Sequence, residues 1–172
     1  MILKGEAVIN DFLNGWFERH DFDVVAQMGT DFAINLGDNT LYYTTLYNED
    51  TERIYREEIL KDFPDFANCD TSVNMLIALF HEVGHYETEN EWEDKDWERF
   101  YAWRERPDIT EREYFRHPIE WRATEWACEY ILEHEEEMCK LWLDLAILFE
   151  WFYEINQVEV DWQNKMFCQF FI

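Results

Sequence analysis

The chain has 172 residues, enough for one domain with its own core, and no stretch rich in Gly, Ser or Pro divides it. Its formal net charge of −25 excludes direct binding to nucleic acid or to an anionic membrane surface, whereas a basic peptide or protein would be attracted. Four cysteines without a CxxC pair, and no signal-peptide pattern at the first residues, predict a cytoplasmic protein with free thiols.

The first third of the chain predicts a helix followed by a small sheet. Apolar residues at helical spacing predict an amphipathic helix over about residues 5–19. Three short strands are predicted over 23–28, 31–36 and 40–46, because turn signals at Gly29-Thr30 and Gly37-Asp38-Asn39 separate them. We expect these strands to form an antiparallel meander. Another helix is predicted over about 49–62, just before Pro64.

Residues 81–85 read His-Glu-Val-Gly-His, an HExxH pentad within an otherwise apolar stretch that predicts a helix over about 72–86. Helical positions four apart share a face, so His81 and His85 can bind one metal ion while Glu82 reaches a metal-bound water. In the competing interpretation, the two histidines only fill space or form hydrogen bonds in a buried helix. The metal interpretation is favoured because buried polar groups need partners, and one ion satisfies both imidazoles.

A catalytic zinc ion usually has three protein ligands, so the pentad needs a third. Residues 117–132 predict a second helix, with Pro118 in its first turn. Glu120 lies one turn before Ala123, whose small side chain allows two helices to approach closely. Glu125 is the alternative, and because it lies about 140° further round the helix, both acids cannot contact the same ion. His117 and the acids of the intervening segment also remain open.

The two helices together resemble a known family. The matching positions are the pentad residues His81, Glu82, Gly84 and His85 and the downstream residues Glu120, Ala123, Trp126 and Ala127. This pattern resembles the ImmA/IrrE-like family of intracellular metallopeptidases, within the Glu-zincin group. The resemblance covers two short helices. It implies an α+β, zincin-like fold that is mostly helical, with Zn²⁺ bound by His81, His85 and Glu120 and with Glu82 as the general base.

The function predicted on this basis is zinc-dependent hydrolysis of peptide bonds in a protein or peptide substrate. Zinc lowers the pKa of its bound water, and Glu82 accepts the proton. A donor to the transition state is also needed, and Tyr86, Tyr114 and His117 are the candidates. Two other functions compete: a non-catalytic zinc-binding regulatory module, and an acidic protein that mimics nucleic acid and inhibits a DNA-binding partner.

An acidic, aromatic-rich insertion at 86–117 separates the two motifs. Trp97, Phe100, Tyr101 and Arg104 share one helical stripe, and Thr110 with Glu113 predicts a capping box for a short helix ending at His117. We expect the insertion to form a lid or a cleft wall. The alternative is a packed helical insertion with a solvated acidic face.

The C-terminal part is strongly apolar. Residues 141–155 predict a buried helix that is too short and too charged to span a membrane. The final run 166–172 predicts a strand or a segment packed across a dimer interface, so a homodimer stays open.

Overall fold

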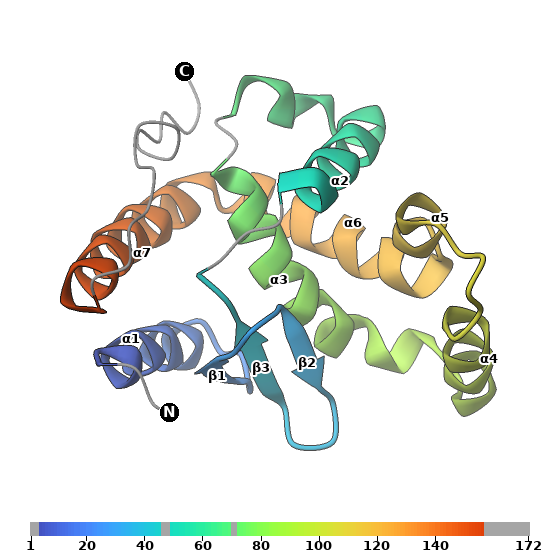
Figure 1. The fold of residues 1–172 in the computed structure, drawn as a ribbon, viewed down its shortest axis with the longest axis horizontal. Helices are drawn as coiled ribbons and strands as arrows, with labels where there is room; N and C mark the ends of the chain where they lie inside the picture. Colours follow the sequence, from blue (N-terminus) through green and yellow to red (C-terminus); the bar gives the residue numbers. More distant parts are fainter. Residues whose placement is uncertain (1–3, 46–48, 70–71, 157–172) are drawn as a thin grey trace.

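The structure is a computed structural model that describes residues 4–45, 49–69 and 72–156. These residues form a mostly helical α+β fold around a small three-stranded sheet (Figure 1). The α+β class predicted from the sequence is confirmed. The apolar run 166–172, expected as a strand or a dimer contact, lies outside the described residues.

The sheet contains the three predicted strands in an arrangement that the sequence did not predict. Strands β1 (Val25–Met28), β2 (Ala33–Asn35) and β3 (Thr40–Tyr43) pair in the order β1-β3-β2. β3 is antiparallel to β2 but parallel to β1. The antiparallel meander was therefore wrong, because β1 does not pair with β2.

Helix α1 (Glu6–Arg19) explains this topology, because it occupies the outer edge of β1. The Asn14 side chain accepts a hydrogen bond from the backbone N–H of Ala26 at 2.6 Å and donates one to its carbonyl at 3.3 Å. Asn10 accepts from the backbone N–H of Met28 at 2.9 Å. With one edge of β1 held by α1 and the other by β3, the segment after β1 must carry the chain to the far side of β3.

The predicted helices are present, with small differences at their ends. After α1 come α2 (Glu49–Asp62), the short 3-10 helix η1 (Pro64–Asn68) and α3 (Val73–Thr88), which contains the pentad. Helix α6 (Pro118–Glu133) contains Glu120, and α7 (Glu135–Asn156) begins earlier than the apolar run that predicted it. Among the described helices, none has the length and apolar character needed to cross a membrane.

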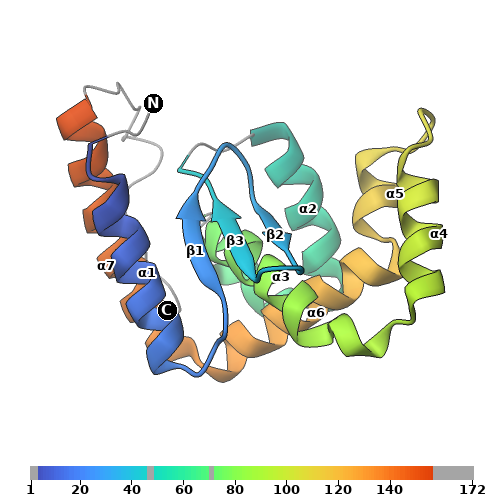
Figure 2. The same cartoon turned by 90° about the horizontal axis from the view of Figure 1, so that it is seen from below.

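Helix α3 lies at the centre of the fold and is covered from several directions. Figure 2 shows α1 and α7 side by side on one flank of the sheet and α2, α4 and α5 on the other, with α6 running beneath the sheet between them. One continuous apolar cluster joins the sheet with α1, α2, α3, α5, α6 and α7; its fully buried side chains include Ile9, Phe17, Leu41, Leu76, Phe80, Ile131, Met138 and Phe152. Because α3 contributes to this core along most of its length, the pentad is built on a rigid element.

The 86–117 insertion folds as short helices. After α3 come η2 (Glu89–Glu91), α4 (Asp94–Arg104) and α5 (Glu111–Phe115). The predicted capping box is confirmed: the backbone N–H of Glu113 donates to Thr110 Oγ1 at 3.2 Å, and that of Thr110 donates to the Glu113 carboxylate at 3.0 Å. Phe100 of α4 is buried and packs near the rings of Tyr114 and His117. The insertion is thus packed on the fold by its aromatic residues.

Candidate metal centre

The centre depends on an unusually close contact between α3 and α6. A Cβ atom added to Gly84 of α3 would lie 2.4 Å from the carbonyl oxygen of Ala123 in α6 and 3.0 Å from its carbonyl carbon. Any side chain at this position would collide with backbone, so glycine is required for this approach. The sequence predicted that the small side chain of Ala123 would permit close packing, but it gave no reason to assign the same role to Gly84.

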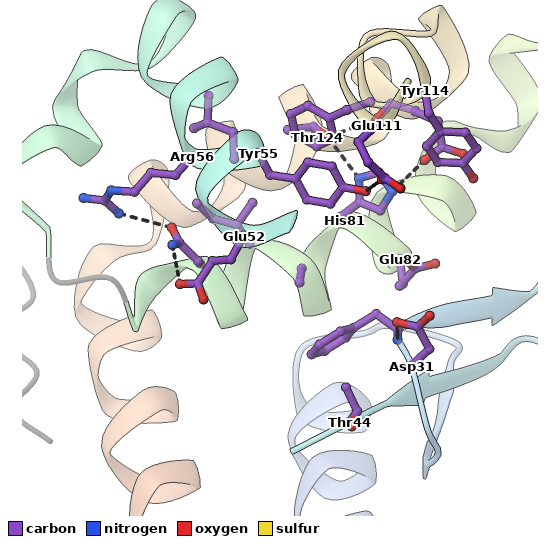
Figure 3. Close-up of a pocket in the computed structure, with 17 residues that line it drawn as sticks. Asp31, Thr44, Glu52, Tyr55, Arg56, His81, Glu82, Glu111, Tyr114 and Thr124 are labelled. Carbon is purple, nitrogen blue, oxygen red and sulfur yellow. Dashed lines mark hydrogen bonds and ion pairs between the residues drawn. The ribbon is translucent and has the colours of Figure 1, made fainter. Parts of the chain in front are cut away.

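A cavity of about 410 Å³ opens beside this helix pair (Figure 3). Residues from α2, α3, α5 and α6 and from the segment preceding β2 line it. Among them are His81, Glu82 and Glu120. Glu111 and Tyr114 of α5 also line the cavity, so the insertion forms part of its wall.

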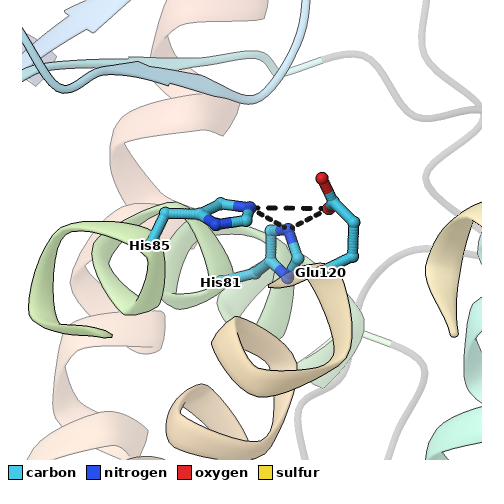
Figure 4. Close-up of side chains that lie close together, drawn as sticks. All are labelled: His81, His85 and Glu120. Carbon is cyan, nitrogen blue, oxygen red and sulfur yellow. Dashed lines mark hydrogen bonds and ion pairs between the residues drawn. The ribbon is translucent and has the colours of Figure 1, made fainter. Parts of the chain in front are cut away.

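The structure brings His81, His85 and Glu120 together, as the sequence predicted (Figure 4). The Nε2 atoms of the two histidines are 3.1 Å apart. Glu120 Oε2 lies 3.1 Å from Nε2 of His81 and 3.4 Å from Nε2 of His85. The three side chains are largely buried, with exposed fractions of 14%, 10% and 7% in the order His81, His85, Glu120. These three ligand atoms could hold a metal ion.

The spacing of these atoms fits a tetrahedral zinc site. Zinc bonds of about 2.0–2.1 Å place neighbouring ligand atoms about 3.3 Å apart, close to the 3.1 Å and 3.4 Å observed here. Two imidazole nitrogens and one carboxylate oxygen are also a donor set that catalytic zinc sites use. Ligand atoms this close together need a proton or a metal cation between them. The arrangement is therefore compatible with a bound metal ion.

Thr124, which the sequence analysis did not single out, orients one of the histidines. Its hydroxyl donates to the carbonyl of Glu120, one turn earlier in α6, at 3.1 Å. The same oxygen lies 3.0 Å from Nδ1 of His81, so it accepts the Nδ1–H proton. When the ring is neutral, this hydrogen bond leaves the Nε2 lone pair of His81 directed at the other two ligand atoms. A buried threonine four residues after a ligand on the same helix face was the signal for this role.

Burial and charge shift the pKa of each acid in the centre. Burial alone would raise the pKa of Glu120, but hydrogen bonds and charge from His81 and His85 outweigh it and hold that pKa far below its usual value. Burial raises the pKa of Glu82, and the histidine charges only partly oppose the change. For His81, burial lowers the pKa, whereas the hydrogen bond to Glu120 and the nearby carboxylates raise it overall. Glu120 is consequently ionised and suited to bind a cation.

Glu82 occupies the position expected of a group that acts on a small ligand. Its residue is 8% exposed, and it lines the cavity next to the histidines. It accepts no hydrogen bond from any residue that the structure describes. A buried carboxylate in this situation needs a partner, which a water or a substrate in the cavity would provide.

The structure shows where the other candidate ligands and candidate transition-state donors lie relative to the cavity. Glu125, the alternative third ligand, accepts a hydrogen bond from Nε1 of Trp121 at 2.9 Å and does not join the group of ligand atoms. Tyr114 lines the cavity, and burial together with the adjacent Glu120 carboxylate raises its pKa. His117 instead caps α6, where its Nδ1 accepts from the backbone N–H of Ile119 at 3.3 Å. His117 and Tyr86 are not among the residues that line the cavity.

The described part of the chain is thus an α+β fold with a buried His-His-Glu group able to hold a metal ion. Comparison with family models, with curated proteins and with solved structures found no match to this chain. The resemblance to the ImmA/IrrE-like metallopeptidases therefore stays a prediction.

Proposed function

We propose that this chain is a zinc-dependent metallopeptidase that hydrolyses peptide bonds in a protein or peptide substrate. The observation that supports the proposal is the meeting of His81, His85 and Glu120 beside a cavity that His81, Glu120 and Glu82 line. A metal centre that served only to stabilise the fold would have no need of an adjacent cavity or of a buried acid without a hydrogen-bond donor.

Each residue of the centre has a distinct role in this reaction. The two pentad histidines and Glu120 would hold zinc, which when bound lowers the pKa of water and polarises a peptide carbonyl. The Glu82 carboxylate accepts a proton from the attacking water and delivers it to the departing amine nitrogen. The Tyr114 hydroxyl, at the same cavity wall, donates a hydrogen bond to the oxygen that becomes negatively charged in the transition state.

Metal content provides the first test. We expect the purified protein to contain about one zinc ion per chain by inductively coupled plasma mass spectrometry, and His81→Ala, His85→Ala and Glu120→Ala to lose it. His134→Ala and Glu125→Gln are matched controls, because they remove the same residue types outside the ligand group. If the three ligand variants keep full zinc content, the metal centre is wrong.

Catalysis is tested separately with Glu82→Gln. This variant should keep its zinc, because Glu82 is not a ligand, but should no longer cleave a random-sequence peptide library that the wild-type protein cleaves. Cleavage sites would be read by mass spectrometry. Equal cleavage by wild type and Glu82→Gln, or none by the zinc-loaded wild type, would overturn the peptidase proposal.

A further inference from the structure

The cavity extends beyond the metal centre into a region with apolar walls and an acidic rim. Its apolar walls are formed by residues from several elements: Phe32, Ile59, Ile77, Ala78 and Phe115. Tyr55 adds an aromatic surface, because its ring stacks on that of Phe115 at 4.2 Å with an interplanar angle of 11°. A long aliphatic stem fits between such walls.

Two acids, Asp31 and Glu111, lie on opposite sides of this region (Figure 3). Asp31 precedes β2 on the sheet side, and Glu111 begins α5 on the helical side. Glu111 accepts a hydrogen bond from the Tyr55 hydroxyl at 3.3 Å, and Asp31 accepts one from the backbone N–H of Phe32 at 2.9 Å. Neither acid forms an ion pair with another described residue.

The basic residue in the cavity wall, Arg56, does not neutralise these two acids. Arg56 is the one Lys or Arg among the described lining residues. Its guanidinium donates to Asn74 Oδ1 at 3.1 Å and to the carbonyls of Phe66 and Cys69 at 3.1 Å and 2.9 Å. These contacts fix Arg56 against the segment after α2. The carboxylates of Asp31 and Glu111 are therefore available to bind a cationic ligand.

The charges of this region act on a common space beside Tyr55. Burial raises the pKa of Tyr55, and the charges of Glu111 and Asp31 raise it further. Glu82 itself is 8% exposed, lines the cavity and has no hydrogen-bond donor among the described residues, as expected where a ligand binds.

We propose that this region is a specificity subsite that binds the side chain of a lysine or arginine in the substrate, with Asp31 and Glu111 flanking the cationic group and Tyr55 packing on its stem. The inference rests on the proposed peptidase function, because it assigns the substrate class of that same site. A cavity of about 410 Å³ has room for an arginine side chain and ordered water.

Binding to zinc-loaded Glu82→Gln protein tests the subsite without cleavage. Two N-acetylated, fluorescein-labelled peptides would differ only in one internal residue, arginine or its neutral isostere citrulline. From fluorescence anisotropy we expect the arginine peptide to bind about 10-fold more tightly at low salt. Adding Asp31→Asn and Glu111→Gln together should reduce that ratio to about 2-fold or less. Both substitutions retain a hydrogen-bond acceptor, so the local contacts can persist.

Glu98→Gln is the matched control, because it removes one negative charge from an exposed position of α4 outside the cavity. It should leave the ratio unchanged. An arginine-to-citrulline ratio near one, or a ratio that survives the double substitution, would overturn the subsite. A citrulline peptide with a free amino terminus tests the other possible source of positive charge, which is the N-terminal ammonium group. If it binds as tightly as the acetylated arginine peptide, the cavity selects an N-terminal ammonium group and the side-chain proposal is wrong.

The two proposals fail in distinguishable ways. Wild-type protein that cleaves arginine and citrulline peptides equally well would overturn the subsite and keep the peptidase. Selective binding of the arginine peptide by a protein that cleaves no peptide would keep the subsite and overturn the peptidase.

Discussion

Replacing Gly84 by alanine tests whether the close contact between α3 and α6 builds the metal centre. The added Cβ would lie 2.4 Å from the carbonyl oxygen of Ala123 and 3.0 Å from its Cα. Carbon and oxygen atoms that are not bonded normally approach to about 3.3–3.6 Å. The helices must therefore separate by about 1 Å. Because the obstructing atoms belong to backbone, no side-chain rotation relieves the clash.

The expected magnitude follows from two opposing effects. Overpacking of this kind costs about 1–3 kcal/mol, and the better helix propensity of alanine returns about 1 kcal/mol. We expect the free energy of unfolding of the metal-free protein to fall by about 1–2 kcal/mol. The ligand atoms on the two helices are 3.1 Å and 3.4 Å apart, whereas metal–ligand distances tolerate errors of only about 0.2 Å. Zinc affinity should therefore fall at least about 10-fold.

Zinc affinity would be measured by competition with a chromophoric chelator, and stability by urea unfolding in excess chelator. Gly15→Ala is the matched control, because Gly15 lies in α1 and an added Cβ would meet only the end of the flexible Arg19 side chain, at 3.2 Å. It should keep zinc affinity and gain about 0.4–1 kcal/mol of stability. Wild-type zinc affinity in Gly84→Ala would refute the reasoning, and equal zinc loss in both variants would show that the effect is not local.

Three further outcomes are expected. Thr124→Val keeps the side-chain shape but removes the acceptor for Nδ1 of a ligand histidine, so zinc affinity should fall about 10-fold in the same competition assay. Tyr114→Phe should keep zinc and lower kcat about 10²–10³-fold, and an unchanged kcat would remove Tyr114 from the mechanism. Burial raises the pKa of Glu58, but hydrogen bonds from Lys61 and Arg116 outweigh burial and lower that pKa below the unfolded value of 4.5. The ionised Glu58 side chain therefore stabilises the fold above pH 4.5, and this contribution is lost as the pH falls through the folded pKa. Glu58→Gln should then cost about 2 kcal/mol at neutral pH and progressively less in acid, and a cost that does not vary with pH in urea unfolding would contradict the assignment.

Local patterns were sufficient to predict the helices and to select the three side chains that meet in the candidate centre. Helices α1 and α2 begin and end within a residue of their predicted bounds, because apolar spacing and the Pro64 that follows α2 are local features of the sequence. His81 and His85 share a face through spacing alone. Only one of two acids five residues apart can face the ion, and Glu120 could be preferred over Glu125 because it lies one turn before the small residue Ala123. The meeting of these residues then depended on a single correct inference, that their two helices pack together.

Interactions between distant segments were not predictable in the same way. The pairing of β1 with β3 depends on Asn10 and Asn14, which hold the outer edge of β1 from α1. The alternation of apolar and polar residues in the strands does not reveal this contact between α1 and β1. Turn residues show where the chain reverses, but they do not show which strand edge the next strand pairs with. Gly84 was likewise visible only as a pentad residue, since its requirement for a missing side chain depends on the backbone of α6.

The structure also separates the effect of total charge from that of local charge. A net charge of −25 suggests general attraction for cations, but at physiological salt exposed charges are screened beyond about 8 Å. Only the acids that line the cavity can then act strongly on a ligand inside it, and these are Asp31, Glu52, Glu82, Glu111 and Glu120. A bound divalent cation offsets part of this charge. Because zinc would bind the folded and not the unfolded chain, it should raise the free energy of unfolding by about 4 kcal/mol at a thousand-fold excess over Kd. Asp31 and Glu111 form no ion pair with another described residue, which is why selection for a basic side chain should follow these two acids and not the overall charge.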